Sequence, residues 1–274
     1  MKRLYGYLMA TAMLVALVGA GGGSASAATG AHYYLALGDS LARSAQPNGD
    51  YQHGYAEQLL ALLQQQDPSF RLVKLGCGGA TTTDMIYGSS DPSCAFPHKT
   101  QLAEAVAFLE AHRKFVSLVT IDIGANDLPD LSSIATNLPI ILDELRAAAG
   151  PYVPIVGMNY YDPNLATIWL GGGSSADLDA EIGSVVAFND FLEGFYKADP
   201  ADGADPYADV ETAFQVTDIT PSVDINGDGV LDPIDVVREC QWTWICVPPP
   251  LGPDVHANTA GYGTIAQAFL DALS

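Results

Sequence analysis

Basic residues are scarce in this chain. Its 274 residues include 11 Lys and Arg against 32 Asp and Glu, which gives a formal net charge of −21 at pH 7. A surface with such an excess of negative charge repels nucleic-acid backbones and anionic lipid headgroups. We therefore expect no nucleic-acid partner. The same charge favours solubility and the binding of cations.

Long hydrophobic runs are also missing, except near the N-terminus. There, two basic residues precede an apolar stretch over residues 8–18, and small residues follow as far as Ala27. This layout is typical of a secretory signal peptide, and the apolar stretch is shorter than the about 20 residues that span a bilayer. We expect residues 1–27 to be a signal peptide and residues 28–274 to form one secreted, monomeric domain without a stable membrane anchor.

The chain has only four cysteines, Cys77, Cys94, Cys240 and Cys246. In an exported protein they are candidates for two disulfides, and three pairings are possible. We expect Cys77–Cys94 and Cys240–Cys246, because each pair closes a short loop in a region that otherwise reads as irregular. Zinc is disfavoured, because the spacings and neighbouring residues do not match common zinc patterns.

Strand-like and helix-like segments alternate along most of the chain. Such alternation predicts an α/β fold in which helices cover both faces of a parallel sheet. Residues from about 215 to 252 do not fit the alternation and read as an insertion. The expected strands cover residues 33–37, 71–75, 115–123, 153–158 and 207–210, and the expected helices cover residues 54–63, 101–113, 178–197 and 260–273, with a further helical stretch interrupted near Pro139.

The first of these strands ends in a glycine, a carboxylate and a serine, Gly38-Asp39-Ser40. A buried strand of a parallel sheet would deliver the Ser40 hydroxyl to the edge where such folds bind ligands. The competing interpretation is a strand followed by a helix N-cap, because Ser and Asp are both favoured there. Taken alone, the run favours the N-cap, so a functional role for Ser40 depends on partners elsewhere.

Three such partners lie at or near the ends of other predicted segments. Gly79 stands in a glycine-rich stretch, Asn126 follows the strand over residues 115–123, and His256 precedes the last helix. Because the carboxyl ends of parallel strands share one edge, these residues and Ser40 can converge. A hydroxyl, an imidazole base and N–H donors together suit acyl transfer. A phosphate-binding loop at the glycines is disfavoured, because no Gly-Lys-Ser/Thr follows.

The residues resemble, in order, the successive blocks of the SGNH hydrolases, also called GDSL esterases and lipases. The resemblance spans about residues 33–270 and implies a flavodoxin-like three-layer α/β/α sandwich and a secreted enzyme that cleaves small ester or lipid substrates. The Gly-x-Ser-x-Gly pentapeptide of another large esterase group is absent. The four blocks are Gly38-Asp39-Ser40-Leu41, Gly78-Gly79-Ala80-Thr81, Gly124-Ala125-Asn126-Asp127, and Asp254-Val255-His256 with Gly261-Tyr262.

The resemblance also implies roles for individual residues. Ser40 would be the nucleophile and His256 the base. The backbone N–H groups of Ser40 and Gly79, with the side-chain amide of Asn126, would form the oxyanion hole. No cofactor would be required for this chemistry.

One departure from the family pattern concerns the acid that orients the histidine. The family usually places this acid three residues before the histidine, where this chain has Pro253, whereas Asp254 lies only two residues before His256. Either Asp254 still reaches the imidazole, or a backbone carbonyl near Pro253 orients the ring. We expect Asp254→Asn to cost less than the about 10⁴-fold loss typical of a triad acid.

A second motif lies within the insertion and resembles an EF-hand or dockerin-type calcium loop. Oxygen ligands recur at the expected spacing, and Gly229 suits the sharp turn. An aspartate replaces the usual final glutamate, so we expect weak binding, on the order of 10⁻⁴ to 10⁻³ M. The calcium would hold the segment that leads into His256; the alternative is an acidic, glycine-rich turn. The candidate ligands are Asp224, Asn226, Asp228, the Val230 carbonyl, Asp232 and Asp235.

Other functions remain open at this point. A carbohydrate O-deacetylase of the same fold is the main alternative to an esterase or lipase. A calcium-dependent, dockerin-like binding module would require a duplicated loop, and only one such loop is present. An inactive relative used for binding is disfavoured by the presence of Ser40, Asn126 and His256 together.

Overall fold

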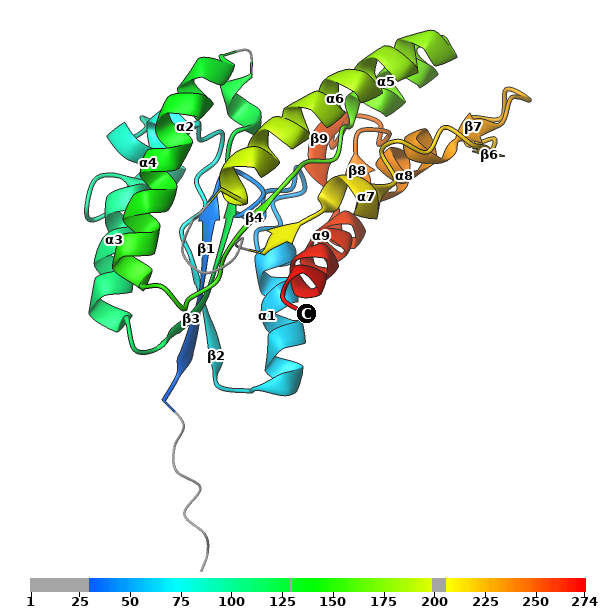
Figure 1. The fold of residues 1–274 in the computed structure, drawn as a ribbon. Coiled ribbons are helices and arrows are strands. Elements are labelled where there is room, and N and C mark those ends of the chain that lie inside the picture. The colour runs from blue at the N-terminus through cyan, green and yellow to red at the C-terminus, as the bar shows by residue number, and fades with distance from the viewer. Residues whose placement is uncertain (1–29, 129, 199–205) are drawn as a thin grey trace, which may run out of the picture.

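A five-stranded parallel sheet forms the centre of the protein in a computed structural model (Figure 1), which describes residues 30–128, 130–198 and 206–274. The predicted signal peptide therefore lies outside the described residues. The strand order is β2-β1-β3-β4-β5, so the α/β prediction is confirmed. The strands are β1 (His32–Gly38), β2 (Phe70–Lys74), β3 (Val116–Asp122), β4 (Ile155–Met158) and β5 (Tyr207–Ala208).

Helices cover both faces of this sheet (Figure 1). On one face α1 (Tyr55–Gln66) packs against α9 (Thr259–Ala272). On the other face α3 (Gln101–His112) packs against α4 (Leu131–Ala149), and α6 (Ser175–Tyr196) contacts β4. Because both faces are covered, the central strands β1 and β3 are almost continuously apolar and buried. The shorter helices are α2 (Thr82–Tyr87) and α5 (Asn164–Leu170), with 3-10 turns at Pro92–Cys94 and Ala125–Asp127.

Helix α4 corrects one expectation, because it continues through Pro139 without interruption. Proline removes one helical hydrogen bond and crowds the preceding turn. Here Leu138, Ile141 and Leu145 on the same helix are fully buried. Packing of this apolar stripe against the core offsets the local penalty, since tertiary contacts supply most of the stability of helices in proteins.

The segment after β5 builds an arm beyond the carboxyl edge of the sheet (Figure 1). Strands β6 and β7 pair antiparallel, and β8 pairs antiparallel with β9. Strand β9 was not predicted, and it carries His256. Both disulfides have the predicted pairing, Cys77–Cys94 and Cys240–Cys246. The elements are α7 (Val210–Phe214), β6 (Pro221–Val223), β7 (Asp232–Pro233), α8 (Ile234–Trp242), β8 (Thr243–Trp244) and β9 (Asp254–Ala257).

The strand order reverses between β1 and β3, which is where ligands bind in doubly wound sheets. Gly38, the last residue of β1, has φ +132, and a Cβ there would lie 2.0 Å from the Asp122 carbonyl oxygen. Glycine thus allows β1 to end tightly against β3. Within residues 30–128, 130–198 and 206–274, no helix is both long and apolar enough to span a membrane.

Candidate active site

Ser40 lies on a tight turn that directly follows β1. The Asp39 N–H donates to the Asp122 carbonyl at 3.0 Å, and the Asp39 carboxylate accepts the Leu41 N–H at 2.8 Å. The Gln101 side chain clamps the residue before this turn, because it accepts the Gly38 N–H at 3.0 Å and donates to the Gly38 carbonyl at 2.8 Å. These bonds fix the backbone that carries the Ser40 hydroxyl.

Two buried carboxyl groups, those of Asp39 and Asp122, accept backbone hydrogen bonds from this turn. The Asp122 carboxyl accepts the Tyr55 hydroxyl at 2.5 Å and the Ala42 N–H at 3.2 Å. Burial raises the pKa of both carboxyls, and the nearby charge of Asp39 raises the pKa of Asp122 further. Burial and an adjacent like charge both disfavour the ionisation of a carboxyl, which is the physical cause of these raised pKa values.

Two backbone N–H groups near the nucleophile are free. Among the described residues, neither the Ser40 N–H nor the Gly79 N–H has a hydrogen-bond partner. Gly79 follows β2 with φ +68, although it is not one of the residues that line the pocket described below. A backbone N–H group without a partner is chemically suited to bind a developing negative charge.

Asn126 occupies the 3-10 turn after β3 and faces the same turn. Its side-chain amide donates to the Ala80 carbonyl at 3.1 Å and to the Asp39 carboxylate at 3.3 Å. The next residue, Asp127, accepts hydrogen bonds from the Thr82 N–H and hydroxyl instead. Asn126 therefore joins the turns after β1, β2 and β3, whereas Asp127 fixes loop geometry.

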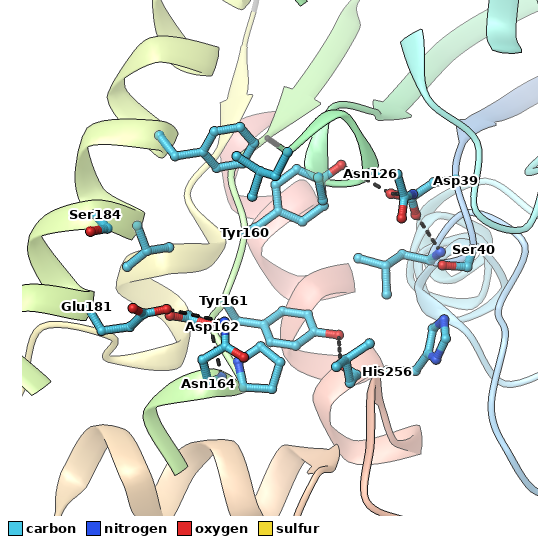
Figure 2. Close-up of a pocket in the computed structure, with 17 residues that line it drawn as sticks. Asp39, Ser40, Asn126, Tyr160, Tyr161, Asp162, Asn164, Glu181, Ser184 and His256 are labelled. Atoms are coloured by element: carbon cyan, nitrogen blue, oxygen red, sulfur yellow. Dashed lines mark hydrogen bonds between the residues drawn. The ribbon is translucent and has the colours of Figure 1, made fainter. Parts of the chain in front are cut away.

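His256 enters the site from β9 with its orientation fixed by Asp254. The Asp254 carboxylate lies 2.7 Å from Nδ1 of His256 and also accepts the His256 backbone N–H at 2.9 Å. Of the two arrangements considered from the sequence, the structure has the first, in which the acid contacts the ring. Since Nδ1 is occupied, Nε2 is the nitrogen left for other chemistry. The ring lies beside Ser40 in Figure 2, and no hydrogen bond joins the two side chains among the contacts of the described residues.

Ser40, Asn126 and His256 line one end of a pocket of about 300 Å³. Asp162, Asn164 and Glu181 line the opposite end (Figure 2). The other residues that line the pocket are mostly apolar or aromatic, a lining typical of small-molecule sites. They include Leu41, Leu128, Tyr160, Tyr161, Val185, Phe188 and Val255.

Sequence reasoning missed the residues of the opposite end. Tyr160, Tyr161 and Asp162 come shortly after β4, and the rule that ligands bind at the carboxyl ends of parallel strands could have identified them. Glu181 lies in the middle of α6, and no local pattern marks it.

The predicted calcium loop connects β6 to α8, and hydrogen bonds between its own side chains and backbone hold its bend. The Asp224 carboxylate accepts the N–H groups of Gly227 and Gly229, and both glycines have positive φ. Asp232 is buried and accepts the Trp169 indole N–H at 2.6 Å. Asp235 is also buried, and one of its carboxylate oxygens has no partner. Over the part of the chain that the structure describes, no three His, Cys, Asp or Glu side chains gather as a group that could hold a metal ion.

Solved structures of other proteins have a fold similar to that of this chain. An alpha/beta hydrolase enzyme from the metagenome of Lake Arreo, Spain, is similar at 18% identity and a TM-score of 0.50, over 89% of this chain and 95% of the other. A family 3 carbohydrate esterase from Clostridium thermocellum is similar at 16% identity and a TM-score of 0.51, over 88% and 94% of the two chains. At these identities the likeness shows the fold alone.

Comparisons of sequence identify the family. The search among curated proteins found no significant match. A family model, in contrast, matches residues 36–263, which is well over half of the chain and includes Ser40, Gly79, Asn126 and His256. With the parallel sheet and the pocket at its carboxyl edge, this match shows that the chain belongs to the GDSL-like lipase/acylhydrolase family.

Proposed function

We propose that this protein hydrolyses carboxylic esters through an acyl-enzyme on Ser40. The observation that carries the proposal is the shared pocket of Ser40, Asn126 and His256, with Nδ1 of His256 held 2.7 Å from the Asp254 carboxylate. A nucleophile, a base and a group that orients the base are the parts that serine hydrolysis requires.

In the first half of the reaction, Ser40 Oγ attacks the ester carbonyl carbon and gives its proton to Nε2 of His256. The developing oxyanion accepts hydrogen bonds from the free N–H groups of Ser40 and Gly79 and from the Asn126 amide. The long 3.3 Å bond between Asn126 and Asp39 is the contact that the oxyanion would replace. The imidazolium then protonates the leaving alcohol, which departs.

In the second half, a water molecule attacks the acyl carbon of the Ser40 ester and gives a proton to His256. Collapse of the oxyanion breaks the bond to Ser40 Oγ, which regains its proton from the imidazolium, and the carboxylic acid leaves. Asp254 stabilises the imidazolium and holds it in its correct orientation.

The apolar wall beyond the serine supports a substrate with more than an acetyl group. Leu128, Val185 and Phe188 line this wall, and apolar side chains favour an alkyl chain over hydroxyl groups. A carbohydrate O-deacetylase is the second candidate, supported by the similar fold of the carbohydrate esterase from Clostridium thermocellum.

Hydrolysis of p-nitrophenyl esters across a series of acyl lengths tests the proposal. We expect activity that rises beyond acetate and vanishes in Ser40→Ala. The exposed Asp179, which does not line the pocket, supplies a matched control as Asp179→Asn, with unchanged rates. Rates no faster than those of Ser40→Ala would contradict the esterase, whereas activity confined to acetyl esters and acetylated sugars would favour the deacetylase.

We also propose that the protein is secreted after removal of residues 1–27. The two disulfides support export, because such bonds persist in oxidising compartments. Mass spectrometry of the protein from culture medium should give an N-terminus at Ala28 and no free thiol. Retention in the cytoplasm with an intact N-terminus would contradict this.

A calcium ion in the loop from Asp224 to Asp235 is a further proposal. Supporting it are the oxygen donors, the positive φ of Gly229 and the unpartnered buried oxygen of Asp235. Because no three carboxylates gather as a group among the described residues, binding would require the loop to rearrange. Calorimetry with millimolar-range calcium, about 10⁻³ M, on EDTA-treated protein should show heat that Asp228→Asn weakens. The absence of heat would refute the site.

A further inference from the structure

The end of the pocket opposite Ser40 is acidic, and its two carboxylates are held by one residue. The Asn164 N–H donates to Asp162 Oδ1 at 3.0 Å, and the Asn164 side-chain amide donates to Glu181 Oε1 at 3.2 Å. Both carboxylates are thus fixed through one oxygen each. Figure 2 shows them together, across the pocket from Ser40 and His256.

The second oxygen of Asp162 is buried without any hydrogen bond. The residue is only 6% exposed, and Oδ2 has no partner. Burial raises the pKa of Asp162 to about 7, and both the negative charge of nearby Glu181 and a hydrogen bond between the two carboxyl groups contribute. A buried acceptor that lacks a partner is costly, and a ligand that supplies positive charge would remove this cost.

Nothing in the pocket wall neutralises these carboxylates. The described residues that line the pocket include no Lys or Arg, and His256 lies at the opposite end. Behind Asp162, Glu239 is also buried, and it accepts the Asp162 N–H at 3.1 Å. Burial and the nearby Asp162 raise the pKa of the Glu239 carboxyl well above its ordinary value, so Asp162 and Glu181 are the acidic groups that face a ligand here.

Aromatic rings complete the surroundings. Tyr160 and Tyr161 line the pocket between its two ends, and the Tyr161 hydroxyl is already bonded to the Val255 carbonyl. Aromatic faces beside carboxylates are a favourable environment for an ammonium group, especially when water is excluded.

We propose that this end of the pocket binds an ammonium group of the substrate, so that the enzyme prefers esters carrying a cation at a distance from the scissile bond. The inference rests on the proposed esterase function and adds the substrate class. The cation can belong to the alcohol part or to the far end of the acyl chain. A neutral polyol is the competing ligand, because hydroxyl groups can also donate to Asp162 Oδ2.

Matched ester pairs test this proposal and distinguish the two sources of the cation. One pair is a choline ester and its isostere with tert-butyl in place of trimethylammonium. The other is a pair of p-nitrophenyl esters whose six-carbon acyl chains end in the same two groups. We expect kcat/KM to favour the cationic ester at least about tenfold in one pair.

Variants of Asp162 and Glu181 then test whether these residues cause the preference for the cationic ester. In Asp162→Asn the ratio of kcat/KM for the cationic and neutral esters should fall toward one. Glu181→Gln, at a partly exposed position, should lower the same ratio and serves if the first variant does not fold. The control Asp179→Asn, on the same helix but outside the pocket, should retain the full ratio.

Two outcomes overturn the inference while leaving the esterase intact: neutral esters cleaved as fast as cationic ones in both pairs, or a preference that survives both variants. If no ester of either pair were hydrolysed, the esterase function would be refuted instead. Binding of the cation to the protein would then test the inference by itself. Calorimetry of choline and of the six-carbon trimethylammonium acid with Ser40→Ala protein should show binding by one of them, and none by the tert-butyl isosteres. No binding by either cation would overturn the inference independently.

Discussion

The two ends of the active-site pocket are built in different ways. At one end, Ser40 and Asn126 sit on short turns directly after β1 and β3, and their neighbours are tied by backbone hydrogen bonds. At the other end, Asp162 follows β4 and Glu181 comes from the middle of α6, and Asp162 keeps an unpartnered oxygen. Hydrogen bonds within the protein hold the first end, where the N–H groups of Ser40 and Gly79 stay free, whereas at the second end a buried carboxylate oxygen of Asp162 lacks a donor.

This difference suggests that one end of the pocket carries out the reaction and the other end selects the substrate. In the proposed reaction, the edge of the sheet places the reacting groups, and the segments after β4 place the groups that would meet the remote part of the substrate. Changes at the serine end should therefore alter rates for every ester by one factor. Changes at the acidic end should alter the ranking of substrates instead.

The largest effect short of removing the nucleophile is expected for Asp254→Asn. Because Asp254 lies 2.7 Å from Nδ1 of His256, we now expect a kcat loss approaching about 10⁴, larger than the spacing alone indicated. Steady-state kinetics should give the same loss for cationic and neutral esters. A loss below about tenfold would show that another group orients His256.

A smaller effect is expected for Asn126→Ala. Removal of one oxyanion donor should lower kcat about 10²- to 10³-fold, with little change in KM. The loss should be equal across acyl lengths, since the oxyanion is common to all esters. Unequal losses would indicate that Asn126 contacts the substrate chain, which would break the separation between the two ends.

The charge of the acidic end should make the ratio of kcat/KM for the cationic and neutral esters depend on pH. Asp162, with a pKa of about 7, is protonated below that pH and charged above it. The preference for the cationic ester should therefore rise as pH increases through about 7. Effects of pH on the chemical steps that both esters share cancel in the ratio, and Glu181 and Glu239 are the acidic groups that face Asp162. A ratio independent of pH would contradict the assignment to Asp162.

The smallest effect concerns stability. Folding raises the pKa of Asp162 from 3.8 to about 7, so the folded state binds a proton more tightly than the unfolded chain. This contribution to the free energy of unfolding is fully present below about pH 4 and is lost as pH rises to about 7. The Tm should therefore fall between about pH 4 and pH 7, and Asp162→Asn should flatten part of that slope. Scanning calorimetry would contradict this if the two proteins had parallel curves.

The sequence could bring Ser40 and Asn126 to one place because strand ends are local features. Apolar runs ending at Gly38 and Ile123 marked the strands, and parallel pairing brings such ends together whatever the loops between them. The disulfide pairing was predictable for a similar reason, since both bridges close short loops.

The sequence could not predict the acidic end or the strand that carries His256. Glu181 faces the pocket because of the way α6 packs. Apolar residues lie on several sides of this helix, so its sequence does not indicate which side faces the pocket. Strand β9 exists only through its pairing with β8, a contact made by four paired residues. The contact of Asp254 with His256 likewise depends on the backbone of that strand.

Labelling with a fluorophosphonate, followed by mass spectrometry of the peptides, tests the central claim most directly. The proposed nucleophile predicts one phosphonyl adduct on the peptide that contains Ser40, slowed in Asp254→Asn and absent in Ser40→Ala. An adduct on another residue, or labelling that persists in Ser40→Ala, would contradict the account.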